Sequence, residues 1–145
     1  MIAELPVNTI AHAIQLAVAP VFLLTGVASI LSVLTNRLGR IIDRSRLLHG
    51  RSASVVETDQ SIQVELKSLK RRARFIHLAI GLCTTCLLLI CSVVAVLFLG
   101  SFIDVNIAVV IASLFVAAML CLIIALFYFI GEIFLATAHV RGGGS

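Results

Sequence analysis

The sequence predicts an all-α integral membrane protein with three transmembrane helices, the first two of which extend beyond the membrane as a cytoplasmic antiparallel hairpin. Hydrophobic residues make up 61% of the 145 residues and charged residues only 12%, whereas a soluble domain is about half apolar and a quarter charged. Three apolar runs, 10–35, 75–99 and 105–135, contain no Lys or Arg. Each run exceeds the ~20 residues that cross a bilayer as a helix. Helices are the expected form because they satisfy their own backbone hydrogen bonds in lipid.

The basic residues predict how these helices are oriented. Ten of the 11 Lys and Arg residues lie in the 37–74 segment and the eleventh is Arg141, after the third run. Short segments rich in Lys and Arg stay in the cytoplasm, so we expect the N-terminus outside and the C-terminus inside. The predicted parts are a periplasmic N-terminus with the first transmembrane helix, a basic hairpin, two further transmembrane helices and an added linker, at 1–36, 37–74, 75–141 and 142–145.

Two matched apolar stripes predict the hairpin. Both follow the alternating four- and three-residue spacing of one helical face, and they consist of Leu34, Leu38, Ile41, Ser45 and Leu48, then Ile62, Leu66, Leu69, Ala73 and Ile76. Gly50 marks the turn between them, and Ser54 with Glu57 fits a capping box at the start of the returning helix. In this pairing Arg46 faces Glu65. The alternative is a loose basic loop.

Five arginines crowd together where the hairpin meets the membrane, namely Arg37, Arg40, Arg71, Arg72 and Arg74. Like charges at one height repel one another unless something anionic lies between them. Anionic lipid headgroups are the first candidate, at roughly 1 kcal/mol per basic residue near an anionic leaflet. Glu132, late in the third run, is the second candidate. We expect it to be an interfacial partner for one of the arginines rather than a transport carboxylate.

A family resemblance rests on the segment IQLAVAPVFLLTGVASILSVLTNRLGRIIDRSR, residues 14–46, followed by a basic segment and two more apolar runs. Its most specific residues are Gln15, Pro20, Asn36, Arg37, Arg40, Asp43 and Arg44. The chain resembles the bacterial family of small membrane proteins known as domain of unknown function 2721, over most of its length. The resemblance implies a multi-pass protein of the bacterial inner membrane, and it implies no activity.

The first apolar run carries a polar stripe on one helical face. Its ten residues again alternate in spacing between four and three, and eight of them are polar or small: Asn8, His12, Gln15, Ala19, Phe22, Gly26, Ser29, Val33, Asn36 and Arg40. Polar groups within a membrane turn toward protein or water, and small residues let helices approach closely. A helix that faces only lipid does not require such a stripe.

Two interpretations of this polar stripe stay open. It is a helix-packing seam within or between protomers, or it lines a pore at the axis of several protomers, because three helices are too few to enclose a water path. In the pore, Phe22 is an apolar constriction, and the predicted lining comprises Asn8, His12, Gln15, Phe22, Gly26, Ser29, Asn36 and Arg40. We therefore expect a homo-oligomeric channel. The alternative function is a membrane scaffold or accessory subunit whose basic hairpin binds a partner or anionic lipid.

The remaining motifs favour neither catalysis nor a cofactor. Cys83 and Cys86 form a C-x-x-C pair, but it lies within an apolar span and no second pair accompanies it at metal-ligand spacing. Buried cysteines behave as small hydrophobic residues, and we expect that role here. The sequence shows no phosphate-binding glycine loop, nucleophile motif or paired carboxylates within a span. We expect no enzyme, no metal, no cofactor and no nucleic-acid partner.

Overall fold

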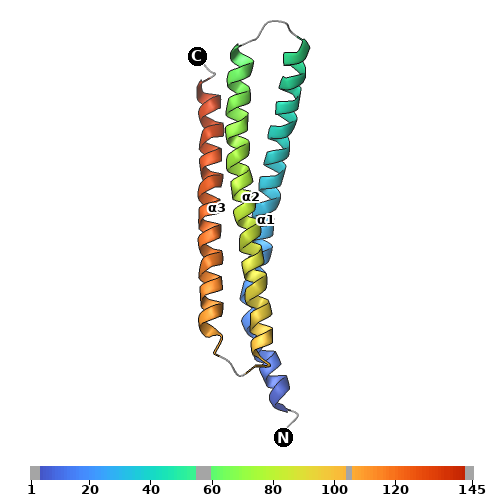
Figure 1. The fold of residues 1–145 in the computed structure, drawn as a ribbon, viewed down its shortest axis with the longest axis vertical. Helices are drawn as coiled ribbons and strands as arrows, with labels where there is room; N and C mark the ends of the chain where they lie inside the picture. The colour runs from blue at the N-terminus through green and yellow to red at the C-terminus, as the bar shows by residue number, and fades with distance from the viewer. Residues whose placement is uncertain (1–3, 55–59, 104–105, 143–145) are drawn as a thin grey trace. The chain divides into compact units, whose positions relative to one another are not determined.

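The computed structural model describes residues 4–54, 60–103 and 106–142, which form three long helices in chain order (Figure 1). They are α1 (Glu4–Ser54), α2 (Gln60–Gly100) and α3 (Ala108–Gly142). All three are long and apolar enough to cross a membrane. This confirms an all-helical, multi-pass membrane protein with three candidate spans.

The helices contribute to two compact units, each of which contains a part of all three. The first unit comprises Met1–Ile30 and Leu82–Ile123, and the second comprises Leu31–Gly81 and Ile124–Ser145. The core of the first unit is built largely from small side chains: Ala13, Ala17, Val27, Cys83, Cys86, Ile90, Val93 and Ala118. Small side chains let helix backbones approach closely where lipid gives no hydrophobic drive for association.

The second unit has a core of larger apolar side chains and one buried charge. Its apolar members are Leu34, Ile41, Leu48, Leu66, Leu69, Ile76, Ala79 and Ala125, and the charged one is Glu132. Every residue of the two stripes predicted between 34 and 76 is buried or half-buried. The four-and-three spacing therefore identified the packing faces of α1 and α2 correctly.

The end of α1 differs from the expected turn at Gly50. The helix continues through Gly50 to Ser54, and Gly50 does not adopt a positive φ angle. A glycine within a helix costs only about 1 kcal/mol relative to alanine, and the buried Leu48 side chain anchors this turn of the helix. Ser54, the expected N-cap of the returning helix, is instead the last residue of α1, and Glu57 lies outside the residues that the structure describes.

Candidate functional site

The second unit holds a carboxylate that is shared by two arginines from different helices. The Glu132 side chain of α3 is fully buried. Arg37 of α1 donates from Nη1 to Glu132 Oε2, and Arg72 of α2 donates from Nε and Nη2 to Glu132 Oε1 over 3.1 and 2.8 Å. The two guanidinium groups are partly exposed, at 36% and 25% of their side-chain surfaces. This triad therefore joins all three helices through one buried charge.

The helical repeat explains why these three residues meet. If the seven positions of the repeat are lettered a to g, with the buried stripes of α1 and α2 at a and d, then Arg37 and Arg72 both occupy g. In antiparallel helix pairs the g positions of the two helices face each other along one edge of the seam. On α3, the buried residues Ala118, Ala125 and Glu132 recur every seven residues. Glu132 thus takes the place of a small packing residue and projects toward the two arginines.

The position of Glu132 late in the third apolar run predicts a pairing with one arginine of the membrane-proximal group. The structure confirms a pairing and adds a second partner, so the carboxylate faces two positive charges. Arg37 also lies over the ring of Phe129, with its Cζ atom 5.4 Å from the ring centroid, at a distance typical of a cation–π contact. The buried carboxylate therefore has hydrogen-bond partners on both oxygens, and the three charged groups together carry a net positive charge.

The expected partner of Glu65 was wrong by two residues. Glu65 Oε1 accepts a hydrogen bond from Arg44 Nε over 3.0 Å, and Arg44 Nη2 lies 2.9 Å from the same oxygen in the ion pair. Arg44 and Glu65 both occupy g positions, whereas Arg46 occupies a b position on the outer surface of α1. Residues that lie at the same level of two antiparallel helices can point in different directions. The level alone therefore does not decide which side chains form an ion pair.

One aromatic ring contacts the triad, and an aromatic pair lies one helical turn from Arg72 and Glu132 in the sequences of α2 and α3. The rings of Phe75 and Tyr128 are in tilted contact, with centroids 5.8 Å apart, and Phe129 stacks beneath Arg37. Tyr and other aromatic rings are enriched where transmembrane helices leave the hydrocarbon. An aromatic layer beside paired charges is the composition expected of a membrane–water interface.

A cavity of about 200 Å³ opens beside the triad, and we call it the arginine cavity. It is lined by Arg37, Arg40, Ile41, Arg44, Leu69 and Arg72. Of the five arginines predicted to bind lipid, Arg37, Arg40 and Arg72 line this cavity. Arg71 and Arg74 line a second cavity, next to Phe75 and Leu78, and Arg71 shares a third one with Arg72. Arg44, which was not among the five predicted arginines, also lines the arginine cavity. Its g position would have identified it.

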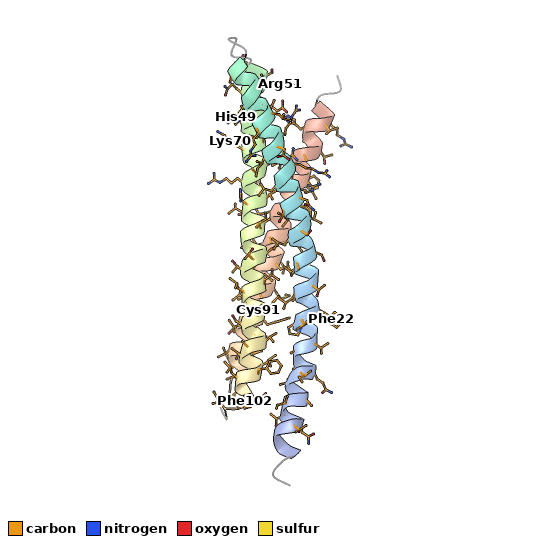
Figure 2. All side chains as sticks on the ribbon, turned by 90° about the vertical axis from the view of Figure 1, so that its right-hand side faces the viewer. Phe22, His49, Arg51, Lys70, Cys91 and Phe102 are labelled. Carbon is orange, nitrogen blue, oxygen red and sulfur yellow. The ribbon has the colours of Figure 1, made fainter. Side chains whose placement is uncertain are left out.

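The polar stripe of α1 lies entirely on the exposed surface of the chain. All ten of its residues are exposed, and Phe22 projects outward with 74% of its surface accessible (Figure 2). The stripe occupies the c and f positions of the repeat, opposite the a and d positions that pack within the protomer. A packing seam within the protomer is therefore excluded. The two other interpretations, a seam between protomers and a pore lining, stay open.

Hydrogen bonding divides the stripe into two kinds of residue. Ser29 donates to the Thr25 carbonyl four residues earlier, over 3.0 Å, so its hydroxyl is satisfied within the helix. Among the residues that the structure describes, the side chains of Asn8, His12, Gln15 and Asn36 have no hydrogen-bond partner in the protein. Such groups are costly when they face hydrocarbon, so they require water or another protein surface if α1 spans a membrane.

Two other features of the first unit concern packing. Cys83 and Cys86 are fully buried, with their thiols free, while Cys91 is exposed. A shallow apolar groove of about 360 Å³ runs beside the polar stripe, and its lining is Ile14, Ala17, Val18, Val21, Phe22, Thr25, Val94 and Phe98. Phe22, a member of the polar stripe, therefore also lines this apolar groove.

Comparison with known proteins agrees with the resemblance described above. A family model matches residues 17–141, and its description is protein of unknown function (DUF2721). The match includes the triad and most of the polar stripe. No curated protein matches the chain, and no solved structure does.

Proposed function

We propose, for a chain that belongs to the DUF2721 family of proteins of unknown function, that it forms a small homo-oligomeric membrane channel with α1 lining the axis. One observation carries the proposal. The ten-residue polar stripe is exposed along its whole length, although the opposite face of α1 supplies the contacts within the protomer. In a bilayer, this arrangement favours association of several copies around the stripe.

The proposed lining follows the stripe from end to end. Asn8, His12 and Gln15 form the outer vestibule, Gly26 and Ser29 the middle, and Asn36 with Arg40 the inner mouth. Phe22 is the one bulky aromatic side chain in the stripe. Rings contributed by several protomers narrow the axis with apolar atoms, and such a constriction excludes ions because their hydration is not replaced. The proposed function involves no catalytic step.

The orientation is part of the same proposal. The concentration of Lys and Arg between 37 and 74 supports a cytoplasmic antiparallel hairpin, an external N-terminus and an internal C-terminus in the bacterial inner membrane. The Arg44–Glu65 ion pair and the buried stripes of α1 and α2 support the hairpin.

Conductance of the reconstituted protein tests the channel. Phe22→Ser widens and wets the constriction, so we expect it to raise the current in planar bilayers. Leu16→Ser is the matched control, because Leu16 is an exposed apolar residue of the same helix that lies outside both the stripe and the groove. Absence of current from both the wild type and Phe22→Ser would contradict the proposal. Equal currents from Phe22→Ser and Leu16→Ser would contradict the assigned lining.

A second function is supported by the surface of the hairpin. A cavity of about 490 Å³ in the hairpin is lined by five polar or basic residues and two apolar ones: His49, Gln60, Gln63, Lys67 and Lys70, with Val64 and Leu66. It suits a scaffold or accessory subunit that binds an acidic partner there. The stoichiometry and central helix of purified particles separate the two functions. A ring with α1 at its centre favours the channel, and α1 on the periphery favours the scaffold.

A further inference from the structure

We propose that the arginine cavity is a binding site for a phosphate group that carries two negative charges, independently of whether the protein conducts ions. Four guanidinium groups line the cavity, those of Arg37, Arg40, Arg44 and Arg72. Three come from α1, at intervals of three and four residues that place them along one side of the helix. The fourth faces them from α2.

The charged groups at the arginine cavity have a net excess of two positive charges, which matches a dianion. Glu132 pairs with Arg37 and Arg72, and Glu65 pairs with Arg44. Four positive groups therefore face two negative ones. Among the described residues, no carboxylate forms an ion pair with Arg40, which is exposed. A phosphate monoester, with a charge of about −1.5 to −2 near neutral pH, supplies the missing negative charge.

The cavity also offers the donors that phosphate requires. A guanidinium group has five N–H donors in a planar fork that suits phosphate oxygens. Glu132 engages one nitrogen of Arg37 and two of Arg72, and it thereby holds both side chains in place. Because these arginines are already ordered, binding requires little further loss of side-chain freedom.

The size and the lining favour a small anion over a large one. The volume of about 200 Å³ compares with about 30 Å³ for a water molecule in the liquid, so a phosphate group fits together with a few waters. Ile41 and Leu69 complete the wall. The group belongs either to a lipid headgroup or to a soluble phosphate, because both present the same oxygens.

Calorimetric titration of the detergent-solubilised full chain tests the site. The three probes are inorganic phosphate, a short-chain phosphatidic acid and a short-chain phosphatidylcholine, at a pH about two units above the second phosphate-ester pKa of about 6. Arg40→Gln removes a cavity charge without breaking an ion pair. Arg46→Gln is the matched control, because it removes the same charge from an exposed arginine of α1 outside the cavity. Circular dichroism verifies that both variants are helical.

We expect Arg40→Gln to weaken binding about five- to tenfold, the factor that corresponds to about 1 kcal/mol or slightly more for one basic residue. Arg46→Gln should change the affinity for the phosphate probes less than about twofold, because an exposed charge outside the cavity contributes little. Binding of phosphatidic acid alone assigns the site to a lipid headgroup, and binding of inorganic phosphate as well assigns it to the phosphate group itself. Equal weakening by the two variants, binding of phosphatidylcholine as tight as that of phosphatidic acid, or no binding of any probe would refute the site.

Discussion

Replacing Glu132 with Gln is the sharpest test of how the second unit is held together. The change keeps the size of the side chain and removes its charge, so Arg37 and Arg72 face each other without a carboxylate between them. Three charge-assisted hydrogen bonds join Glu132 to these arginines. Each such bond contributes about 1.5–3 kcal/mol, but part of this sum is offset by the removal of the charged groups from water.

The exposure of the two arginines sets the net effect. Removing one partner of a buried ion pair costs about 3–5 kcal/mol when the remaining charge has no access to water. Here Arg37 and Arg72 keep 36% and 25% of their side-chain surfaces exposed, so both regain some hydration. We therefore expect Glu132→Gln to lower the free energy of unfolding by about 2–3 kcal/mol, below the range for a fully buried pair.

Denaturant titration in mixed micelles measures this loss, with the fluorescence of Tyr128 as the probe of unfolding. Tyr128 belongs to the second unit, contacts Phe75 there, and is the one tyrosine of a chain without tryptophan. Glu65→Gln is the matched control, because Glu65 and Arg44 are 33% and 52% exposed and such pairs contribute only about 0–1 kcal/mol. If Glu132→Gln destabilises the protein no more than Glu65→Gln does, the triad does not stabilise the second unit.

Three further predictions follow from the packing and the charges. Arg44→Glu should destabilise the hairpin by up to about 1 kcal/mol, and adding Glu65→Arg should restore it; coupling of Glu65 to Arg46 instead would refute the register. Cys86→Leu overfills the core of the first unit and should cost about 1–3 kcal/mol in a denaturation titration, whereas Cys91→Leu, at an exposed position, should cost much less; equal losses would show that the core is misplaced. Reporter fusions at residue 3 and at the C-terminus should report an external and an internal location respectively, and a cytoplasmic N-terminus would overturn the proposed orientation.

The sequence was informative wherever one periodic pattern decided the structure. The alternating spacing of Leu34 to Leu48 predicted which side chains of α1 are buried, because burial repeats with the helical period. The same spacing did not predict the Arg44–Glu65 pair. Ion pairs depend on which edge of the seam a side chain leaves, and this follows from the position in the repeat rather than from the count of opposed residues.

The triad was only half predictable for a related reason. Glu132 stood out because an acidic residue is rare in an apolar run, and a basic partner followed from the charge of the 37–74 segment. The choice of Arg37 and Arg72 depends on where α3 packs against the other two helices. The heptad spacing of Ala118, Ala125 and Glu132 carried that information, but small residues are too common in membrane helices for it to be decisive without the structure.

The shared carboxylate also imposes an order on biosynthesis. A ribosome completes α1 and α2 before it reaches residue 132, so the nascent chain holds Arg37 and Arg72 with no acid to separate them. At this level, those two helices lack the three charge-assisted hydrogen bonds to Glu132 until α3 arrives. A chain that ends before residue 132 therefore keeps two arginines without the carboxylate that pairs with both of them in the complete fold.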